Sequence, residues 1–466
     1  MAYKPPRSNI PLLQSIYPEI ESGHSIDSAS VPSLKHIIVV DNSASRIDVK
    51  NLKSAFQFQD AWNSGGHLHG GVKPNEPLHP DDTINIQFTS GTTAMPKAAM
   101  LSHKSILNNG FFIGERMRLT EKDIIVCPPP LFHCFGCILG YMATATHGSA
   151  IIFPTEAFNP MASLQAVQEE RATGLYGVAT MFAAELELLA QGKIKNEGFE
   201  NLRTGIAAGS SVPSVLMGKL HEKLNLTGLT ICYGMTETAP VSFMTRPDDP
   251  MEKRLDSVGQ LMPHVSAKVV SEEDHTTILP VGQKGELVIA GYNVMSGYWG
   301  DKLRTDEVRK IETSPDGKEE VWMYTGDEAE MGADGYVKIT GRIKDLIIRG
   351  GENIHPLEVE NVLFGHPAVV EASVVGLPDE KYGECVAAFV VVHGDVATDE
   401  SGHGAMGGKN VGKQELRDYV REKLSPHLVP KYIFWTESYP KTPSGKVQKF
   451  KLKEEGIKLR DQGKGI

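Results

Sequence analysis

A short loop that combines hydroxyl side chains, glycine and one lysine is the segment of this sequence best suited to chemistry. It reads Phe88-Thr-Ser-Gly-Thr-Thr-Ala-Met-Pro-Lys-Ala98 and follows an apolar, alternating run. Hydroxyls and backbone N–H groups in a tight glycine-containing turn form a concave set of donors, and such a set suits a polyphosphate. A Ser/Thr-rich surface turn is the ordinary alternative. The candidate phosphate-binding residues are Thr89, Ser90, Gly91, Thr92, Thr93, Ala94, Met95, Pro96 and Lys97.

The loop does not fit the nucleotide-binding P-loop, which also joins glycine, lysine and hydroxyls. Pro96 stands where that motif needs its second glycine, and Lys97 is followed by Ala98 rather than Ser or Thr. Without that hydroxyl the usual magnesium ligand of a P-loop is absent. A different kind of phosphate site is therefore predicted.

Four further segments, taken with this loop, carry a resemblance to a known family. They are Tyr233-Gly-Met-Thr-Glu-Thr238, Tyr324-Thr-Gly-Asp327, Gly341-Arg-Ile-Lys-Asp345 and Pro440-Lys-Thr-Pro-Ser-Gly-Lys446. In this order the five segments resemble the core motifs of the adenylate-forming superfamily, which includes acyl-CoA synthetases, luciferases and the adenylation domains of peptide synthetases. The stretches Pro130-Leu-Phe-His-Cys, Tyr233 to Pro240 and Ser444 to Leu452 look most similar to medium-chain acyl-CoA ligases of the mitochondrial type.

The resemblance implies an enzyme that activates a carboxylic acid, with a medium-chain fatty acid as the first expectation. ATP and the acid would form an acyl-adenylate and pyrophosphate, and coenzyme A would then replace AMP to give a thioester. Attack of a carboxylate on the α-phosphorus brings two anions together, so the site needs cations and a metal, here Mg²⁺. An apolar pocket measures chain length weakly, at roughly 0.8 kcal/mol per methylene, so neighbouring lengths and aromatic acids stay open.

Candidate residues for the nucleotide lie in the second, third and fourth motifs. Glu237 is expected to hold Mg²⁺, and the resemblance implies that Thr236 bonds the α-phosphate beside it. Asp327 can accept both ribose hydroxyls, and Arg342 can reach the same sugar from the next strand. A Thr-Glu helix cap and a Thr-Gly-Asp turn are the structural alternatives.

Two segments near the end of the chain are expected to alternate over the site. By resemblance Lys446 contacts the reacting groups during adenylation, although Lys441, Lys449, Lys451 and Lys453 lie close by in sequence and spacing alone does not separate them. Lys344 stands at the family's pivot for rotating the C-terminal domain. That rotation would present Gly350 and Gly351, where a thin pantetheine arm could pass. A plain hairpin turn is the alternative.

Pocket walls are expected from two other segments. His133 lies in the run Pro128 to Gly136, which by resemblance gates the acyl pocket, although a lone His in an apolar run is more often a core residue. Ala208-Gly-Ser-Ser211 resembles the loop beside adenine, which nominates Gly209 and Ser210, and Tyr233 could pack on the adenine ring.

Two tempting motifs are set aside. Gly402 to Gly407 fits the dinucleotide pattern GxGxxG, but no apolar strand precedes it and no helical pattern follows. Cys134 and Cys137 fit CxxC without a second ligand pair, so neither redox nor zinc chemistry is expected.

Short β-branched runs separated by helical stretches predict an α/β protein. The runs begin at His36, Ile84, Asp123, Ser149 and Gly228. They indicate a large N-terminal domain, residues 1–343, of mostly parallel sheets with flanking helices and, from about Glu286, a small β-barrel-like portion. A small mobile α+β C-terminal domain is expected over residues 344–466, with a surface insertion at 394–413.

Composition excludes several classes of protein. The net charge of −11 over 466 residues argues against a nucleic-acid partner. The sequence also has no run of eighteen or more uncharged apolar residues, the length that a membrane-spanning helix needs. Five cysteines are too few for a disulfide scaffold, which favours a reducing compartment, mitochondrial by resemblance or cytoplasmic. Small-molecule partners alone are expected, and the oligomeric state is open.

Two departures from the family pattern bear on activity. Only 87 residues precede Phe88, so the first subdomain looks incomplete, and any transit peptide would be missing. Ala94 and Ala98 stand where the family commonly has glycine. If those backbones need positive φ, each added Cβ would destabilise the loop by on the order of 1 kcal/mol and could weaken ATP binding. Competing readings are an aryl- or oxalyl-CoA ligase, an adenylating enzyme that serves a carrier protein, and a non-catalytic nucleotide-binding remnant.

Overall fold

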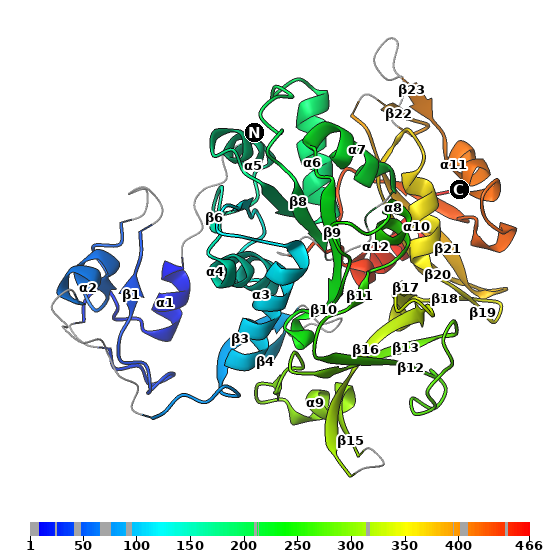
Figure 1. The fold of residues 1–466 in the computed structure, drawn as a ribbon. Helices are drawn as coiled ribbons and strands as arrows, with labels where there is room; N and C mark the ends of the chain where they lie inside the picture. Colours follow the sequence, from blue (N-terminus) through cyan, green and yellow to red (C-terminus); the bar gives the residue numbers. More distant parts are fainter. Residues whose placement is uncertain are drawn as a thin grey trace. The chain divides into compact units, whose positions relative to one another are not determined.

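The chain divides into two compact units, residues 1–78 and 79–466. A computed structural model describes residues 9–23, 26–41, 48–65, 76–89, 96–208, 212, 214–313, 317–394, 396–400, 409–442 and 446–466. Figure 1 traces the units in chain order. The mixed α/β class expected from the sequence is confirmed. None of the helices in the described ranges has both the length and the apolar character that a membrane crossing requires.

The first unit is small. A two-stranded parallel sheet pairs β1 (Ile38–Val39) with β2 (Phe56–Gln57), and two short helices, α1 (Ile10–Ile16) and α2 (Phe58–Gly65), accompany it. Its buried apolar cluster contains Tyr17, Ile20, Ile26, Ile37 and Leu52. Several large apolar side chains of this unit stay exposed, among them Ile38, Val40, Phe56 and Trp62.

A seven-stranded sheet forms the centre of the second unit. Its order is β11-β10-β9-β8-β7-β5-β6, and the five strands from β9 to β6 run parallel. The runs of β7, β8 and β9 are almost entirely buried, as expected of parallel strands covered by helices, whereas β6 at the edge is partly exposed. The strands are β5 (Ile124–Val126), β6 (Ala150–Ile152), β7 (Gly174–Gly177), β8 (Thr204–Ala208), β9 (Gly228–Gly234), β10 (Val241–Met244) and β11 (Gln260–Leu261).

Helices connect these strands and begin at identifiable caps. Ser102 and Ser105 form a capping box at the start of α3 (His103–Met117), and Asn159 accepts from the first turn of α5. The remaining connections are η1 (Phe135–Met142), α4 (Ala143–His147), α5 (Pro160–Glu169), α6 (Ala179–Ala190), α7 (Ser214–Leu224) and α8 (Met251–Asp256).

The strand that precedes the phosphate loop differs from the expectation. β3 (Thr83–Thr89) is not a buried parallel strand; it forms an antiparallel hairpin with β4 (Lys97–Ser102), and β14 (Gly297–Tyr298) pairs with β4. Phe88 is 70% exposed and Ile84 49% exposed. The apolar run is the same in either arrangement, and only the pairing partner decides how deeply it is buried.

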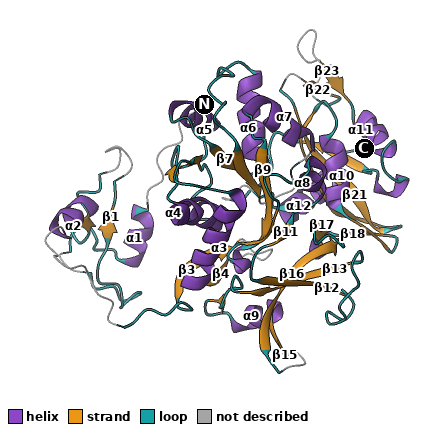
Figure 2. Cartoon of the chain, in the orientation of Figure 1, coloured by secondary structure: helices purple, strands orange, loops and turns teal. Residues whose placement is uncertain are grey.

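The barrel-like portion is a five-stranded antiparallel sheet. Figure 2 shows its strands side by side around the long β16. The predicted turn at Ala333-Asp-Gly joins β16 to β17, and Gly335 adopts φ +77° there. The strands are β12 (Val265–Val270), β13 (Lys284–Gly291), β15 (Arg309–Thr313), β16 (Glu319–Met331) and β17 (Val337–Arg342), and α9 (Lys302–Val308) precedes β15.

A small α+β portion completes the chain. Its main sheet has the order β19-β18-β21-β20, with β24 parallel to β21. The expected insertion holds a short parallel pair, and residues 401–408 within it lie outside the described ranges. The elements are η3 (Ile343–Asp345), β18 (Ile347–Arg349), β19 (Glu352–Ile354), α10 (Pro356–Phe364), β20 (Val369–Asp379), β21 (Gly383–Val392), β22 (Val396–Thr398), β23 (Lys409–Val411), α11 (Lys413–Arg421), η4 (Pro426–Leu428), β24 (Tyr432–Trp435) and α12 (Lys449–Asp461).

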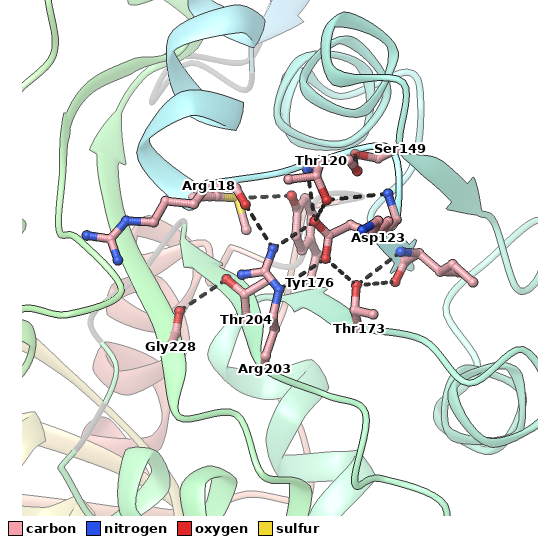
Figure 3. Close-up of polar contacts among 12 residues, drawn as sticks. Arg118, Thr120, Asp123, Ser149, Thr173, Tyr176, Arg203, Thr204 and Gly228 are labelled. Atoms are coloured by element: carbon pink, nitrogen blue, oxygen red, sulfur yellow. Dashed lines mark hydrogen bonds and ion pairs between the residues drawn. The ribbon is translucent and has the colours of Figure 1, made fainter.

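A carboxylate clamps the starts of three neighbouring parallel strands. Asp123, Thr173 and Arg203 directly precede β5, β7 and β8. Figure 3 shows the Arg203 guanidinium facing Asp123, with Nε–Oδ1 and Nη2–Oδ2 distances of 3.1 and 2.7 Å. The Thr173 hydroxyl donates to Oδ1 at 2.7 Å, and Thr120 donates to Oδ2. Burial alone would raise the pKa of Asp123, but these donors hold it below its usual value.

Replacing Asp123 with asparagine is expected to destabilise the protein by about 2 kcal/mol, because it removes the negative charge and turns one of the two acceptor oxygens into an NH₂ group that cannot accept. The magnitude stays below that of a fully buried pair because Arg203 is 41% exposed. The native pKa is depressed, so the stabilisation is complete above the ordinary carboxyl pKa of about 4 and disappears as pH falls through the folded value.

Urea unfolding at several pH values measures this effect. The matched control is Asp248→Asn, which removes an exposed Asp–Arg pair with an O–N distance of 2.6 Å to Arg118. Its effect should be much smaller, because water screens an exposed pair. Equal effects of the two substitutions would contradict the clamp.

A carboxyl group lies in the middle of the inward face of α6. Glu185 is 0% exposed and is flanked on that face by Met181 and Phe182, which are 9% and 0% exposed. Neither carboxyl oxygen of Glu185 has a hydrogen-bond partner among the described residues. Burial raises its pKa well above the usual value, so the folded protein keeps this group protonated.

Replacing Glu185 with methionine is expected to stabilise the protein by about 2 kcal/mol near neutral pH, because an unsatisfied polar group leaves the core. The native pKa is raised, so a further, pH-dependent cost of burying Glu185 is absent below the unfolded carboxyl pKa of about 4 and grows as pH rises above it. Thermal unfolding should therefore show a larger gain at pH 8 than at pH 5. Glu185→Gln should remove this pH dependence, whereas exposed Glu170→Gln should not; a gain that is constant with pH would refute the assignment.

Candidate functional site

A chain of three polar side chains lies beside the phosphate loop. Lys97 Nζ donates to the Tyr298 hydroxyl at 2.9 Å, and that hydroxyl donates to Glu237 Oε1 at 2.6 Å. The pairing of β14 with β4 brings Tyr298 to this place, opposite Ala99. Glu237 is only 4% exposed, and its Oε1 lies 4.0 Å from Lys97 Nζ. The lysine of the first motif and the carboxylate of the second are therefore held together.

Several cations surround this chain. Burial lowers the pKa of Lys97, Glu237 opposes that effect, and the positive charges of Lys344, Arg304 and Arg342 add to it. Desolvation and the charge of Glu237 raise the pKa of Tyr298, so its phenol stays protonated and donates. An excess of positive charge near one carboxylate is an arrangement suited to a polyphosphate with a divalent metal.

The third and fourth motifs meet in an antiparallel ladder. Asp327 in β16 lies opposite Arg342 in β17, with an Oδ1–Nε distance of 3.0 Å. The hydroxyl of Tyr233, at the end of β9, donates to Asp327 Oδ2 at 2.7 Å. Burial and the charge of Asp327 raise the pKa of Tyr233. Asp327 is 7% exposed and is held in position by these two donors. The sequence predicted packing of the Tyr233 ring on adenine; the structure shows that the Tyr233 hydroxyl also binds Asp327.

His133 lies next to the second motif. Its Nδ1 accepts from the Phe135 backbone N–H at 3.1 Å, and Cys134 Sγ lies 3.7 Å from the Thr236 hydroxyl. Burial, with a smaller contribution from the charge of Lys446, lowers the pKa of His133 to about 4. The same burial raises the pKa of Cys134 to about 11. Both groups are neutral near pH 7, and an unprotonated Nδ1 is consistent with its role as an acceptor.

The structure separates Lys446 from its neighbours in sequence. Lys441, Lys449 and Lys453 donate to Glu371, Glu360 and Glu384 at 3.0, 2.7 and 2.7 Å, and Lys451 lies over the Phe450 ring. Lys446 is exposed and has no carboxylate partner among the described residues, while its charge acts on His133 and Cys134. It is thus the lysine of this group that stands nearest to the candidate site.

Lys344 and the two predicted glycines lie at the start of the small portion. Lys344 is exposed within η3, close enough to Lys97 to lower its pKa. Gly350 and Gly351 turn the chain between β18 and β19 with φ of +64° and +88°, which explains glycine at both positions. The Gly350 N–H donates to Tyr382 O at 2.7 Å. They form a hairpin turn, and their role in passing coenzyme A stays a prediction.

Part of the predicted site lies outside the described residues: Ser90, Gly91, Thr92, Thr93, Ala94, Met95, Gly209 and Ser210. At the two ends of the phosphate loop, Thr89 pairs with Lys97 across the hairpin, and Pro96 is exposed. The Thr89 hydroxyl is buried and has no hydrogen-bond partner among the described residues. A buried hydroxyl without a partner at the mouth of this loop is consistent with a missing ligand.

Two residues of the cluster were not predicted. Tyr298 bridges Lys97 and Glu237, and Arg304, on α9, adds positive charge. They are 201 and 207 residues from Lys97 in sequence, and the Trp299-Gly-Asp301 turn before α9 offers no signal beyond a helix cap. Only strand pairing brings them to the site.

Of the two motifs that were set aside, the structure describes one. Cys134 and Cys137 are free thiols, and no group of three candidate metal ligands occurs within the described ranges. The GxGxxG segment at 402–407 lies outside those ranges.

Comparison with known protein families gives two matches. The description "AMP-binding enzyme" fits residues 18–299, and "AMP-binding enzyme C-terminal domain" fits residues 358–446. The first match alone extends over more than half of the chain.

Curated relatives and a solved structure agree with these matches. An acyl-CoA ligase, sidI, of Aspergillus fumigatus is 49% identical over 81% of this chain, which covers 62% of that relative's length. The human mitochondrial medium-chain acyl-CoA ligase ACSF2 is 36% identical over 95% of this chain and is covered over 68% of its own length. ATP-bound MatB from Rhodopseudomonas palustris superposes with a TM-score of 0.72 at 28% identity, covering 90% of this chain and 78% of that one.

Proposed function

Because this chain belongs to the family of AMP-binding enzymes, which includes acyl-CoA ligases, we propose that it activates a carboxylic acid with ATP and passes the acyl group to coenzyme A. In the first half-reaction the acid's carboxylate attacks the α-phosphorus, forming acyl-AMP and releasing pyrophosphate. In the second the thiol of coenzyme A attacks the acyl carbonyl and AMP leaves. The observation that supports this proposal is a polar network in two halves, Lys97–Tyr298–Glu237 and Tyr233–Asp327–Arg342, with Arg342 close enough for its charge to act on Lys97. The charge of Lys446 acts on His133 beside it.

Each half of this network has a chemical task in the proposal. Asp327, fixed by Tyr233 and Arg342, presents acceptor oxygens to the ribose hydroxyls. Lys97, with Arg304 and Arg342 nearby, neutralises the β- and γ-phosphates. Thr236 donates to the α-phosphate, and Lys446 approaches the reacting carboxylate from the side of His133.

Glu237 fits a magnesium ion. It is a buried carboxylate whose Oε1 accepts a hydrogen bond from Tyr298. Its other oxygen would supply a single ligand to the ion. Mg²⁺ usually takes one or two carboxylates and completes its shell with phosphate oxygens and water. When bound, the ion would neutralise charge that develops on the phosphates.

A medium-chain fatty acid is the proposed substrate class, as in the name of the human relative. The segment 128–136 would wall the acyl pocket, with His133 neutral and therefore compatible with an apolar chain. We also propose that the boundary between the N-terminal and C-terminal domains lies between residues 343 and 344, within the turn after β17. For the cellular location we propose mitochondria or cytoplasm.

Two assays on the purified chain test the proposal. Exchange of labelled pyrophosphate into ATP reports adenylation, and thioester formation with coenzyme A reports the second step, each with a panel of acids from acetate to long fatty acids and including benzoate and oxalate. Both reactions with C6 to C12 acids are expected. Exchange without thioester formation would point to another acyl acceptor. A lack of exchange with every acid of the panel would refute the proposal.

A further inference from the structure

A histidine of the small portion reaches across to the strand that carries Asp327. His355 precedes α10, and its Nε2 lies 3.2 Å from Glu328 Oε2 on β16. Both side chains are largely buried, 13% and 10% exposed. Neighbouring residues of a strand point to opposite faces, so Asp327 faces Tyr233 and Arg342 while Glu328 faces the small portion.

The chemistry of this contact is defined by its surroundings. Burial lowers the pKa of His355, Glu328 and Glu358 oppose that effect, and Lys284 adds to it. Nε2 is the ring nitrogen that faces the Glu328 carboxylate, and a carboxylate can only accept. The other ring nitrogen, Nδ1, has no hydrogen-bond partner among the described residues. The Thr340 hydroxyl also contacts Glu328 Oε2.

The space for the imidazole depends on the hinge segment. Gly341 lies opposite Glu328 in the β16–β17 ladder, and a Cβ at this position would come within 3.2 Å of His355 Nδ1. A second histidine, His393, makes a weaker contact of the same kind, 3.8 Å from Glu187 on α6. Two contacts at separate places define an orientation, because a rotation about residues 342–345 could not keep both.

We propose that His355 is a positioning residue, whose buried contact with Glu328 holds the small portion in the orientation that brings Lys446 close to His133. This inference rests on the proposed function. The contact favours adenylation, and it must break before the second half-reaction if that step needs a rotated small portion. His355 itself touches no reacting atom.

The test separates the two half-reactions in His355→Phe, which keeps a ring but loses the donor. Pyrophosphate exchange should fall about five- to tenfold, the range expected for loss of one polar contact with a charged group that water partly replaces. Conversion of supplied acyl-adenylate by coenzyme A should stay within twofold or become faster. His355→Gln, which retains an N–H donor, should restore exchange to within twofold of the unmodified protein.

A matched control and an assay that needs no activity complete the design. His427→Phe removes a pair of equal length, 3.2 Å to Glu352, whose partners both belong to the small portion, and it should leave both rates unchanged. Limited trypsin cleavage at the exposed Lys344 should rise several-fold in His355→Phe and not in His355→Gln or His427→Phe.

These outcomes keep the two proposals apart. If the unmodified chain shows no exchange with any acid, the proposed function fails, and trypsin cleavage alone decides the inference. If the chain is active, equal losses in both half-reactions, or no change in exchange, would overturn the inference and leave the proposed function standing. Unchanged cleavage at Lys344 in His355→Phe would overturn it in either case.

Discussion

Replacing Lys446 with alanine is expected to slow acyl-adenylate formation by about a hundred- to a thousandfold, the range for loss of one positioned group that stabilises transition-state charge. Lys446 has no carboxylate partner among the described residues, and its charge reaches His133 and Cys134. Its ammonium group is therefore available for the carboxylate and α-phosphate as negative charge builds up between them. Exchange of labelled pyrophosphate into ATP measures this step.

The second half-reaction distinguishes a catalytic role from a general loss of structure. If Lys446 acts in adenylation, its alanine variant should still convert supplied acyl-adenylate to thioester at a rate within a few-fold of the unmodified chain. Lys449→Ala is the control, because that lysine neighbours Lys446 in sequence but is paired with Glu360 at 2.7 Å. Exchange within twofold of normal in Lys446→Ala, or equal losses in the two variants, would remove Lys446 from the proposed site.

Replacing Glu237 with glutamine is expected to lower the adenylation rate about a hundredfold and to shift its magnesium dependence to higher concentration. Glutamine can still accept from the Tyr298 hydroxyl through its amide oxygen, so the shape of the site is kept while the charge is lost. The half-buried Lys97 would at the same time lose the anion that opposes the lowering of its pKa. Titration of exchange activity with MgCl₂ at saturating ATP measures both the fall in adenylation rate and the shift in magnesium dependence.

Tyr298→Phe separates the charge of Glu237 from its hydrogen bond. This variant leaves the carboxylate and Lys97 in place but removes the hydroxyl that joins them at 2.6 and 2.9 Å. We expect the adenylation rate of Tyr298→Phe to fall by about tenfold or less, with an unaltered magnesium requirement. A normal magnesium titration in Glu237→Gln would show that Glu237 does not hold the metal.

Much of the architecture follows from local patterns in the sequence. The short β-branched runs that contain Val126, Ile152 and Ile231 became parallel strands of one sheet, and the Ala333-Asp-Gly turn joins two antiparallel strands as predicted. These features depend on side-chain alternation and turn chemistry within a few residues, so they can be read without knowledge of the fold. The run at Ile84 was misjudged, because its pairing partner determines its exposure.

The site divides in the same way. Sequence identified the family and nominated Lys97, Glu237, Asp327, Arg342 and Lys446, because each stands in a short motif of defined spacing. Only the tertiary structure distinguished Lys446 from its ion-paired neighbours, added Tyr298 and Arg304, and revealed the contact of His355 with Glu328. Burial, charge pairing and proton position depend on groups that lie far apart along the chain, such as Tyr233 and Asp327, separated by 94 residues. Such distances carry no local pattern, and folding alone brings these groups into contact.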